Sequence, residues 1–239
     1  MRLSWLLAII LLLALPTWAA VTVDAVGPGA TGTSISASTP LTWTHVVSGA
    51  NTLLVVVVAV SRNPDTGNSV TATYNSVSMT SVAVVHSHNS TGGFVQMLYL
   101  VNPASGSHTV SLSIAGTLTS EVTIAGSVSF NGVNQTTPIG HTATAFGSGT
   151  TASVAVTSSS GNLVIDGVCT GSGVSSSTQT NRWLKNNTGA TQCGNAAEST
   201  ASGSASVTMS YTVTNDSWGI IGVDVNAVAT ISRRPISIW

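Results

Sequence analysis

The stretch LLVVVVAV, residues 53–60, decides the fold class. It is too short to cross a bilayer as a helix, which needs about 20 residues. Its run of valines disfavours a helix, because branched side chains lose rotamer freedom there. Turn-forming residues precede it in SGAN, 48–51, and follow it in SRNPDTGN, 61–68. A short apolar run between turns predicts a strand that is buried on both faces in the middle of a core.

Alternation of apolar and polar residues predicts further strands along the chain. In LTWTHV, 41–46, alternation places Leu41, Trp43 and His45 on one face, and 69–85 has the pattern of a hairpin that turns at Asn75-Ser76. The other predicted strands are 94–101, 108–115, 121–130, 152–158, 162–169, 205–213 and 218–225. No segment shows an amphipathic helical period, and many short strands with regular turns indicate a β-sandwich or a barrel.

The two halves of the chain resemble each other. Residues 39–60 resemble 150–168, and residues 107–131 resemble 204–226. The second half offers no counterpart of 94–101, since its segment 170–203 is polar and poor in strand formers. We therefore expect an all-β fold, a single two-sheet β-sandwich of jelly-roll type that arose by internal duplication. Two immunoglobulin-like sandwiches are the alternative.

The composition limits the class of protein and of partner. Charged residues make up 5% of the 239 residues, against roughly 25% in ordinary soluble domains. Hydrophobic residues make up 43%, which argues against disorder, so we expect a β protein whose outer faces carry Ser and Thr. The net charge of −1 gives no reason to expect a nucleic-acid partner.

The N-terminal residues have the layout of a secretory signal peptide. Arg2 precedes the apolar run 5–15, Pro16 breaks this run, and Thr17 and Ala19 suit the cleavage site. We expect residues 1–19 to be removed, residues 20–228 to form the sandwich domain, and residues 229–239 to form a C-terminal tail. The mature protein would then have no membrane span and would be extracellular or on the cell surface.

Export bears on the two cysteines, Cys169 and Cys193. An oxidising compartment favours their pairing, and both flank a polar segment that a disulfide would hold. We therefore predict a disulfide between them.

The carboxylates and histidines form no recognisable catalytic or metal site. Glu121, Asp166 and Asp224 lie in predicted strands, at positions that alternation does not place on one cleft wall, and we expect them to face solvent or strand ends. His86 and His88 would share a strand face, but a metal needs a third ligand, and His45, His108 and His141 remain unplaced as candidates. We expect no metal and no cofactor.

A calcium loop is weighed at NPDTGN, 63–68. It is rich in oxygen ligands but lacks the spacing of an EF-hand, and a Pro-Asp-x-Gly turn explains it equally well.

The segment that the cysteines would enclose holds the best candidate for a ligand site. Asn181, Arg182, Trp183 and Asn186 place an aromatic ring beside polar groups, as sugar recognition requires. The alternative is that Trp183 fills one end of the sandwich together with Leu184. Two other tryptophans, Trp43 and Trp218, lie in strand patterns and are expected in the core.

The order of several segments resembles a family of secreted bacterial β-sandwich modules that occur in large cell-surface and phage-associated proteins. The segments are LTWTHVVSGANTLLVVVVAVS (41–61), LYLVNPASGSHTVSLSI (98–114), GSVSFNGVNQTTPIG (126–140), NLVIDGV (162–168), SVTMSYTV (206–213) and WGIIGVDV (218–225). The resemblance covers about residues 24–228. It implies an extracellular module that binds or displays something, and it brings no established catalytic residues.

We therefore expect a secreted, non-enzymatic module that acts as a structural or adhesion unit of a surface or appendage. A carbohydrate-binding module for surface glycans is the alternative, and a glycoside hydrolase is a more distant one. Strand-like segments near both ends, 21–26 and 230–239, predict self-association through edge strands.

Overall fold

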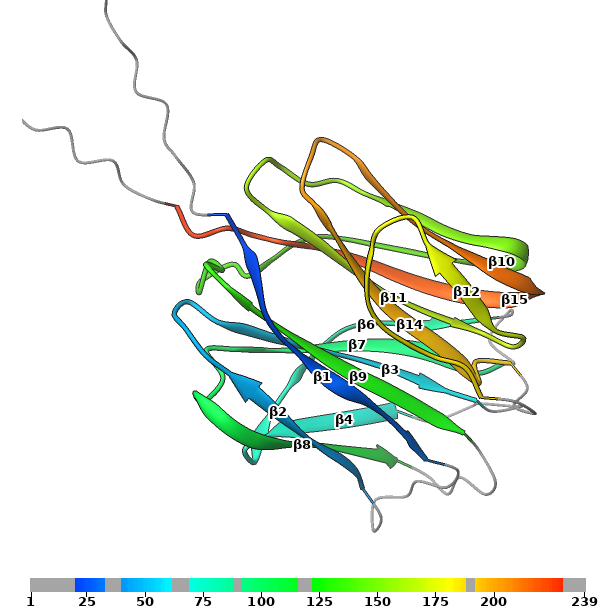
Figure 1. Ribbon diagram of the computed structural model, residues 1–239, viewed down its shortest axis with the longest axis horizontal. Helices are drawn as coiled ribbons and strands as arrows, with labels where there is room; N and C mark the ends of the chain where they lie inside the picture. The colour runs from blue at the N-terminus through cyan, green and yellow to red at the C-terminus, as the bar shows by residue number, and fades with distance from the viewer. Residues whose placement is uncertain are drawn as a thin grey trace, which may run out of the picture.

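The computed structural model describes residues 20–32, 40–61, 69–87, 92–115, 122–187 and 192–229. These residues form antiparallel strands and no helix, and they build three sheets (Figure 1). The predicted all-β sandwich is confirmed. The sheets lie one above another, so the stack holds one sheet more than the two predicted.

The middle sheet contains the segment that decided the fold class. Its order is β1 (Thr22–Gly32), β9 (Thr123–Asn131), β3 (Leu53–Val60), β7 (Phe94–Val101), β6 (Thr80–His86). One outer sheet has the order β2 (Leu41–Val47), β8 (Gly106–Ala115), β4 (Ser69–Tyr74), β5 (Val77–Ser78). The other outer sheet has the order β10 (Ile139–Val156), β15 (Val207–Val225), β11 (Leu163–Thr170), β14 (Asn195–Ser202), β13 (Thr180–Lys185), and β12 (Val174–Ser177) pairs with β15.

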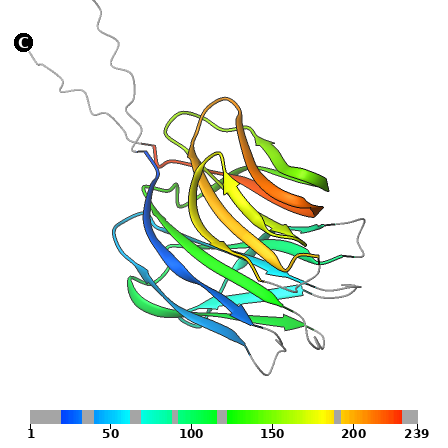
Figure 2. The same cartoon turned by 45° about the vertical axis from the view of Figure 1, so that its right-hand side comes forward.

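Strand β3 is buried on both faces, as predicted, because a sheet covers each face. Leu53, Val55, Val57 and Ala59 point into the core shared with the β11 sheet. The alternate residues Leu54, Val56, Val58 and Val60 point into the core shared with the β2 sheet. Figure 2 shows the middle sheet between its two neighbours.

A third core lies within the β10–β15 sheet, which bends back over itself. A Cβ added at Gly222 would lie 2.5 Å from a methyl carbon of Val156, so the outer part of the long hairpin packs tightly on the inner part. Val154, Met209 and Tyr211 belong to this core.

The two halves of the chain pair their strands in the same way. Strand β3 lies between β9 and β7, and β11 lies between the second part of β15 and β14. Strand β1 pairs with β9 in the same way as residues 139–149 of β10 pair with residues 216–225 of β15. Strand β2 pairs with β8 in the same way as residues 151–156 of β10 pair with residues 207–212 of β15. This equivalence supports the predicted internal duplication.

The segment 170–203 holds three strands that its composition did not predict. Strand β14, NAAESTAS, is buried from Asn195 to Thr200, where it lies between β11 and β13. Its small side chains suit a strand with close neighbours on both faces, which hydrophobicity alone does not reveal.

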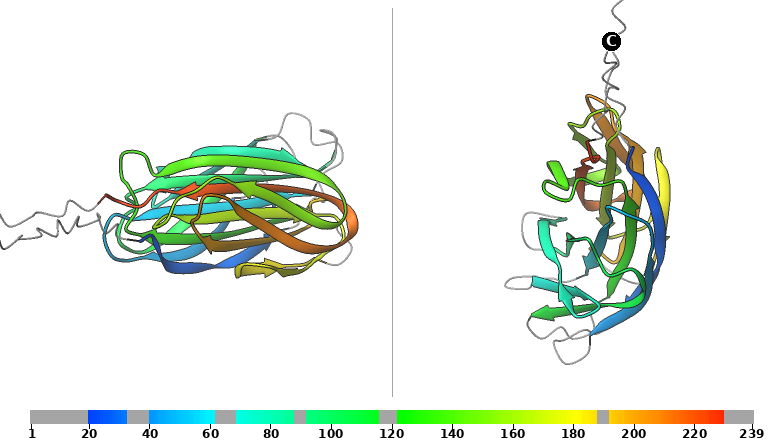
Figure 3. Two further views of the ribbon diagram at one scale, coloured as in Figure 1. Left: turned by 90° about the horizontal axis from the view of Figure 1, so that it is seen from above. Right: turned by 90° about the vertical axis from the view of Figure 1, so that its left-hand side faces the viewer.

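The two ends of the described chain lie together (Figure 3). A Cβ at Gly132 would lie 3.0 Å from the carbonyl oxygen of Ala20, and the Val228 amide donates a 2.8 Å hydrogen bond to the Gly132 carbonyl. The predicted signal peptide, the loop 63–68, His88, Glu121 and residues 230–239 of the predicted tail lie outside the described residues.

Candidate functional site

Trp183 is buried rather than displayed. Its side chain is 8% exposed, and its indole N–H donates a hydrogen bond to the Glu198 carboxylate. The ring packs against Gly126 of the first half, where an added Cβ would lie 2.4 Å from the indole nitrogen. Of the two alternatives, the buried position is the observed one, and the ring offers no face on which a sugar could stack.

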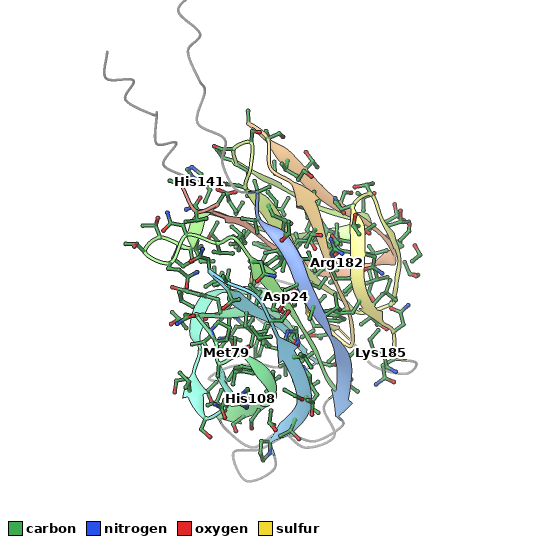
Figure 4. The ribbon with its side chains drawn as sticks, turned by 60° about the vertical axis from the view of Figure 1, so that its left-hand side comes forward. Asp24, Met79, His108, His141, Arg182 and Lys185 are labelled. Carbon is green, nitrogen blue, oxygen red and sulfur yellow. A yellow bond between two sulfur atoms is a disulfide. The ribbon has the colours of Figure 1, made fainter. Side chains whose placement is uncertain are left out.

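Asn181 and Arg182 lie on strand β13 together with Trp183, and Asn186 follows the end of this strand; Figure 4 labels Arg182 and Lys185. The Asn186 amide bonds the backbone N–H and C=O of Val174, at 2.9 and 2.8 Å. Arg182 donates from Nε to the Thr200 hydroxyl at 2.7 Å. Asn181 is exposed, and ligand binding at this strand stays a prediction.

The predicted disulfide between Cys169 and Cys193 is present, and the described residues contain no free cysteine. The disulfide joins the C-terminal end of β11 to the segment that leads into β14.

Asp166 and Glu198 are fully buried, so the expectation that Asp166 faces solvent is wrong. The third core covers the face of β11 that a two-sheet sandwich would leave open. Asp166 Oδ1 accepts hydrogen bonds from the Tyr211 hydroxyl at 2.6 Å and from the Ser199 amide at 2.8 Å. Burial raises the pKa of Asp166 to about 7 although these bonds lower it, and burial raises the pKa of Glu198 well above its usual range.

Asp224 is also buried, contrary to expectation. Its carboxylate accepts hydrogen bonds from the Ser158 hydroxyl and from the Asn162 amide. It lies next to a surface hollow of about 250 Å³ near the ends of the described chain. The residues that line this hollow are Asn134, Ser159, Ser160, Asn162, Asn226 and Ala227.

A chain of hydrogen bonds crosses the first half and joins β2, β9 and β1. The Trp43 indole N–H donates to Ser127 at 2.9 Å, and Ser127 contacts His45 Nδ1 at 2.8 Å. His45 Nε2 contacts Ser129 at 3.0 Å, and Ser129 donates to Asp24 at 2.7 Å. These directions are mutually consistent if the neutral ring carries its proton on Nε2.

This hydrogen-bonded chain has the residue types of a nucleophile–base relay, but its histidine and its two serines are closed to solvent. His45 is 1% exposed, and Ser127 and Ser129 are fully buried. Burial lowers the pKa of His45 to about 4, more than the nearby Asp24 carboxylate raises it, so the ring is neutral at pH 7. These hydrogen bonds therefore give the buried polar side chains their partners, and they hold β1 against β2 and β9.

No cluster of three or more His, Cys, Asp or Glu side chains that could hold a metal occurs in the part of the chain that the structure describes. No helix within that part is long and apolar enough to span a membrane.

An array of accessible polar groups lies on the outer face of the β2 sheet, here called the β2–β8 face. The row Thr42, Ser111, Thr73, Ser78 crosses all four strands through directly paired positions. Thr44 pairs with Thr109 in the next row, and a shallow hollow of about 410 Å³ lies on this face. The residues that line the hollow are Thr73, Asn75, Ser76, Ser107, His108, Thr109 and Ser111. Asn75 and Ser76 form the predicted turn, with φ of 48° and 65°.

The second half carries an equivalent outer face on β10, β15 and β12. Thr151, Thr212 and Ser176 form one row through paired positions, and Ser153 pairs with Ser210 in the next. The outward-pointing side chains of both faces include no Asp, Glu, Lys or Arg among the described residues. The alternation in the sequence predicted hydroxyls on the outer faces but did not show which strands would align them into rows.

Searches found no match of the chain to any family model, curated protein or solved structure.

Proposed function

We propose that this protein is a secreted, non-enzymatic β-sandwich module that adheres to an uncharged, hydroxyl-rich polymer through its β2–β8 face. The observation that carries the proposal is the ordered array of hydroxyls on that face, which lacks charged side chains. The burial of Asp166, Glu198 and His45 supports it, since these groups are out of reach of a substrate. The disulfide is compatible with an extracellular location.

The spacing of the array suits a repetitive partner. Side chains two residues apart on a strand are about 6.8 Å apart, and neighbouring strands are about 4.8 Å apart. Each hydroxyl both donates and accepts, and each hydrogen bond contributes only about 0.5–1.5 kcal/mol net. Many such contacts are needed, and a polymer supplies them through repeated, multivalent engagement.

Retention on insoluble polysaccharides tests this function. We expect the purified protein to be retained on at least one neutral polysaccharide, and the double variant Thr44→Val, Thr109→Val to lose most of that retention. Valine keeps the branched shape and removes the hydroxyls. The matched control is Thr208→Val, Thr212→Val on the other outer face.

Equal loss in both double variants would contradict the assignment to the β2–β8 face, and no retention of the unmodified protein would contradict the function. Loss in Asn181→Ala alone would favour a glycan site on β13 instead. Release of sugars from any of these polymers would contradict a non-enzymatic role.

A further inference from the structure

The pairing equivalence places β1 and residues 139–149 of β10 at the same position, the edge of a sheet, but only β1 is protected. Strand β1 has register shifts between Val23 and Ala25 and between Gly27 and Ala30. It contains Asp24 and Pro28, and β2 lies beside it. Bulges, charges, prolines and covering strands are the features by which natural sheets avoid edge-to-edge pairing.

Between Thr142 and Gly149 the edge of β10 has no bulge, no charge and no proline. From Thr142 to Gly149 it pairs with β15 without a register shift. This run, TATAFGSG, contains no charged residue and no proline. On its other side it pairs with no strand in the ranges that the structure describes.

Apolar groups along this edge are incompletely covered. Ala143 and Ala145 point toward the third core but are only partly buried. Phe146 is 58% exposed, which is the largest value among the exposed large apolar side chains of the described residues. Phe146 pairs with Gly219, which packs against Val85 of β6, and Val84 on that strand is 44% exposed. Apolar surface therefore borders the free edge on the side of β6.

We propose that the β10 edge, residues 142–149, is an interface at which a second copy of this chain adds its own β10 edge in antiparallel orientation. Antiparallel pairing of one strand with itself follows a twofold axis, so the same surface serves both copies. A second copy matches the edge in charge, since neither side carries any, and its Phe146 would lie on the same face as the exposed Phe146 of the first copy. The inference rests on the proposed function as a structural module and supplies that module with a partner.

Sedimentation velocity over a range of protein concentrations tests the pairing. We expect a monomer–dimer equilibrium in the unmodified protein. Thr144→Lys places a charge on the edge and, in the dimer, like charges near each other, so we expect the dimer dissociation constant to rise about tenfold or more. Circular dichroism shows whether the variant is folded.

Two matched controls carry the same charge elsewhere. Thr208→Lys lies on β15 in the outer part of the same hairpin, where it pairs with Ala155 of β10, and Val26→Lys lies on the protected β1 edge. Neither should change the dissociation constant by more than about twofold. Hydrogen exchange should slow in residues 142–149 as concentration rises.

A monomer at every concentration would overturn the inference, as would a dimer that Thr208→Lys weakens as strongly as Thr144→Lys. Slowed exchange confined to β1 or β6 would also overturn it. These outcomes are separate from the proposed function, because retention on a polysaccharide is measured with variants of the β2–β8 face and does not require a dimer.

Discussion

The two halves of the molecule share one pattern of strand pairing but bury different polar groups. The first half buries a neutral histidine in a fully partnered chain of hydrogen bonds. The second half buries three carboxylates, and two of them, Asp166 and Glu198, each have one oxygen without a partner among the described residues. The comparison teaches that pairing geometry determines which positions are buried, while the residue at each position determines how the half responds to pH.

The largest expected effect concerns the contact between the halves. Trp183→Ala removes a buried ring from the core that both halves share and leaves Glu198 without its donor. We expect the free energy of unfolding to fall by about 3–5 kcal/mol in urea denaturation. Asn181→Ala, on the same strand but exposed, should change it by less than about 0.5 kcal/mol. A small loss for Trp183→Ala would show that the halves are held together by other contacts.

The second prediction concerns Asp166 in the second half. Its pKa is about 7 in the folded protein and 3.8 when unfolded, so the folded state binds more protons between these values. The contribution of Asp166 to the free energy of unfolding is therefore largest below about pH 4. About 3–4 kcal/mol of this contribution is lost as the pH rises to 7. Asp166→Asn should remove the contribution of this carboxylate, so the difference between urea denaturation at pH 5 and pH 8 should shrink, while the buried Glu198 keeps its own contribution. Asp216→Asn, at a partly exposed carboxylate, is the control, and an unchanged slope in Asp166→Asn would refute the assignment.

The third prediction concerns His45 in the first half, where the sign is opposite. Its pKa is about 4 in the folded protein and 6.5 when unfolded, so stability is lost as the pH falls from 6.5 to 4. We expect about 2–3 kcal/mol from this group, and His45→Gln should remove the loss. His108→Gln, on the outer sheet, should not. Because His45 opposes the buried carboxylates Asp166 and Glu198 over this range, the stability of His45→Gln should fall more steeply with rising pH than that of the unmodified protein.

The smallest effect concerns β1. A Cβ at Gly27 would lie 2.2 Å from the Ser127 hydroxyl and 2.7 Å from His45 Nδ1, so Gly27→Ala must displace the strand. We expect a loss of about 1–3 kcal/mol, as overpacking produces, with faster hydrogen exchange in β1. Val26→Ala, at an exposed position of the same strand, serves as the comparison. Faster exchange across the whole first half would mean that β1 does not open separately.

The sequence predicted the strands that carry large apolar side chains. Residues 53–60 and 94–101 are strands as predicted, because their branched and aromatic residues suit a pleated, buried surface. It did not predict β14 or residues 139–149, whose Ala, Gly, Ser and Thr become strand residues only beside their partners.

The carboxylates were misplaced for a related reason. Alternation assigns Asp166 to one face of β11 but does not say what lies over that face. In a two-sheet sandwich it would be solvent, whereas here the folded-back hairpin covers it. The aligned hydroxyl rows of the β2–β8 face likewise depend on register, which the sequence alone does not specify.

The closeness of the two described ends has a mechanical consequence. Thr22 pairs with Asn131 at that end of the stack, and Val133 pairs with Ala227 beside it. A force that pulls the two ends apart therefore acts first on the outermost hydrogen bonds of β1 and β9, and it breaks them one after another instead of loading the whole strand in shear. Under tension between its ends the module would yield at low force by peeling from the N-terminal strand, while a load applied to its outer faces would leave these bonds unstressed.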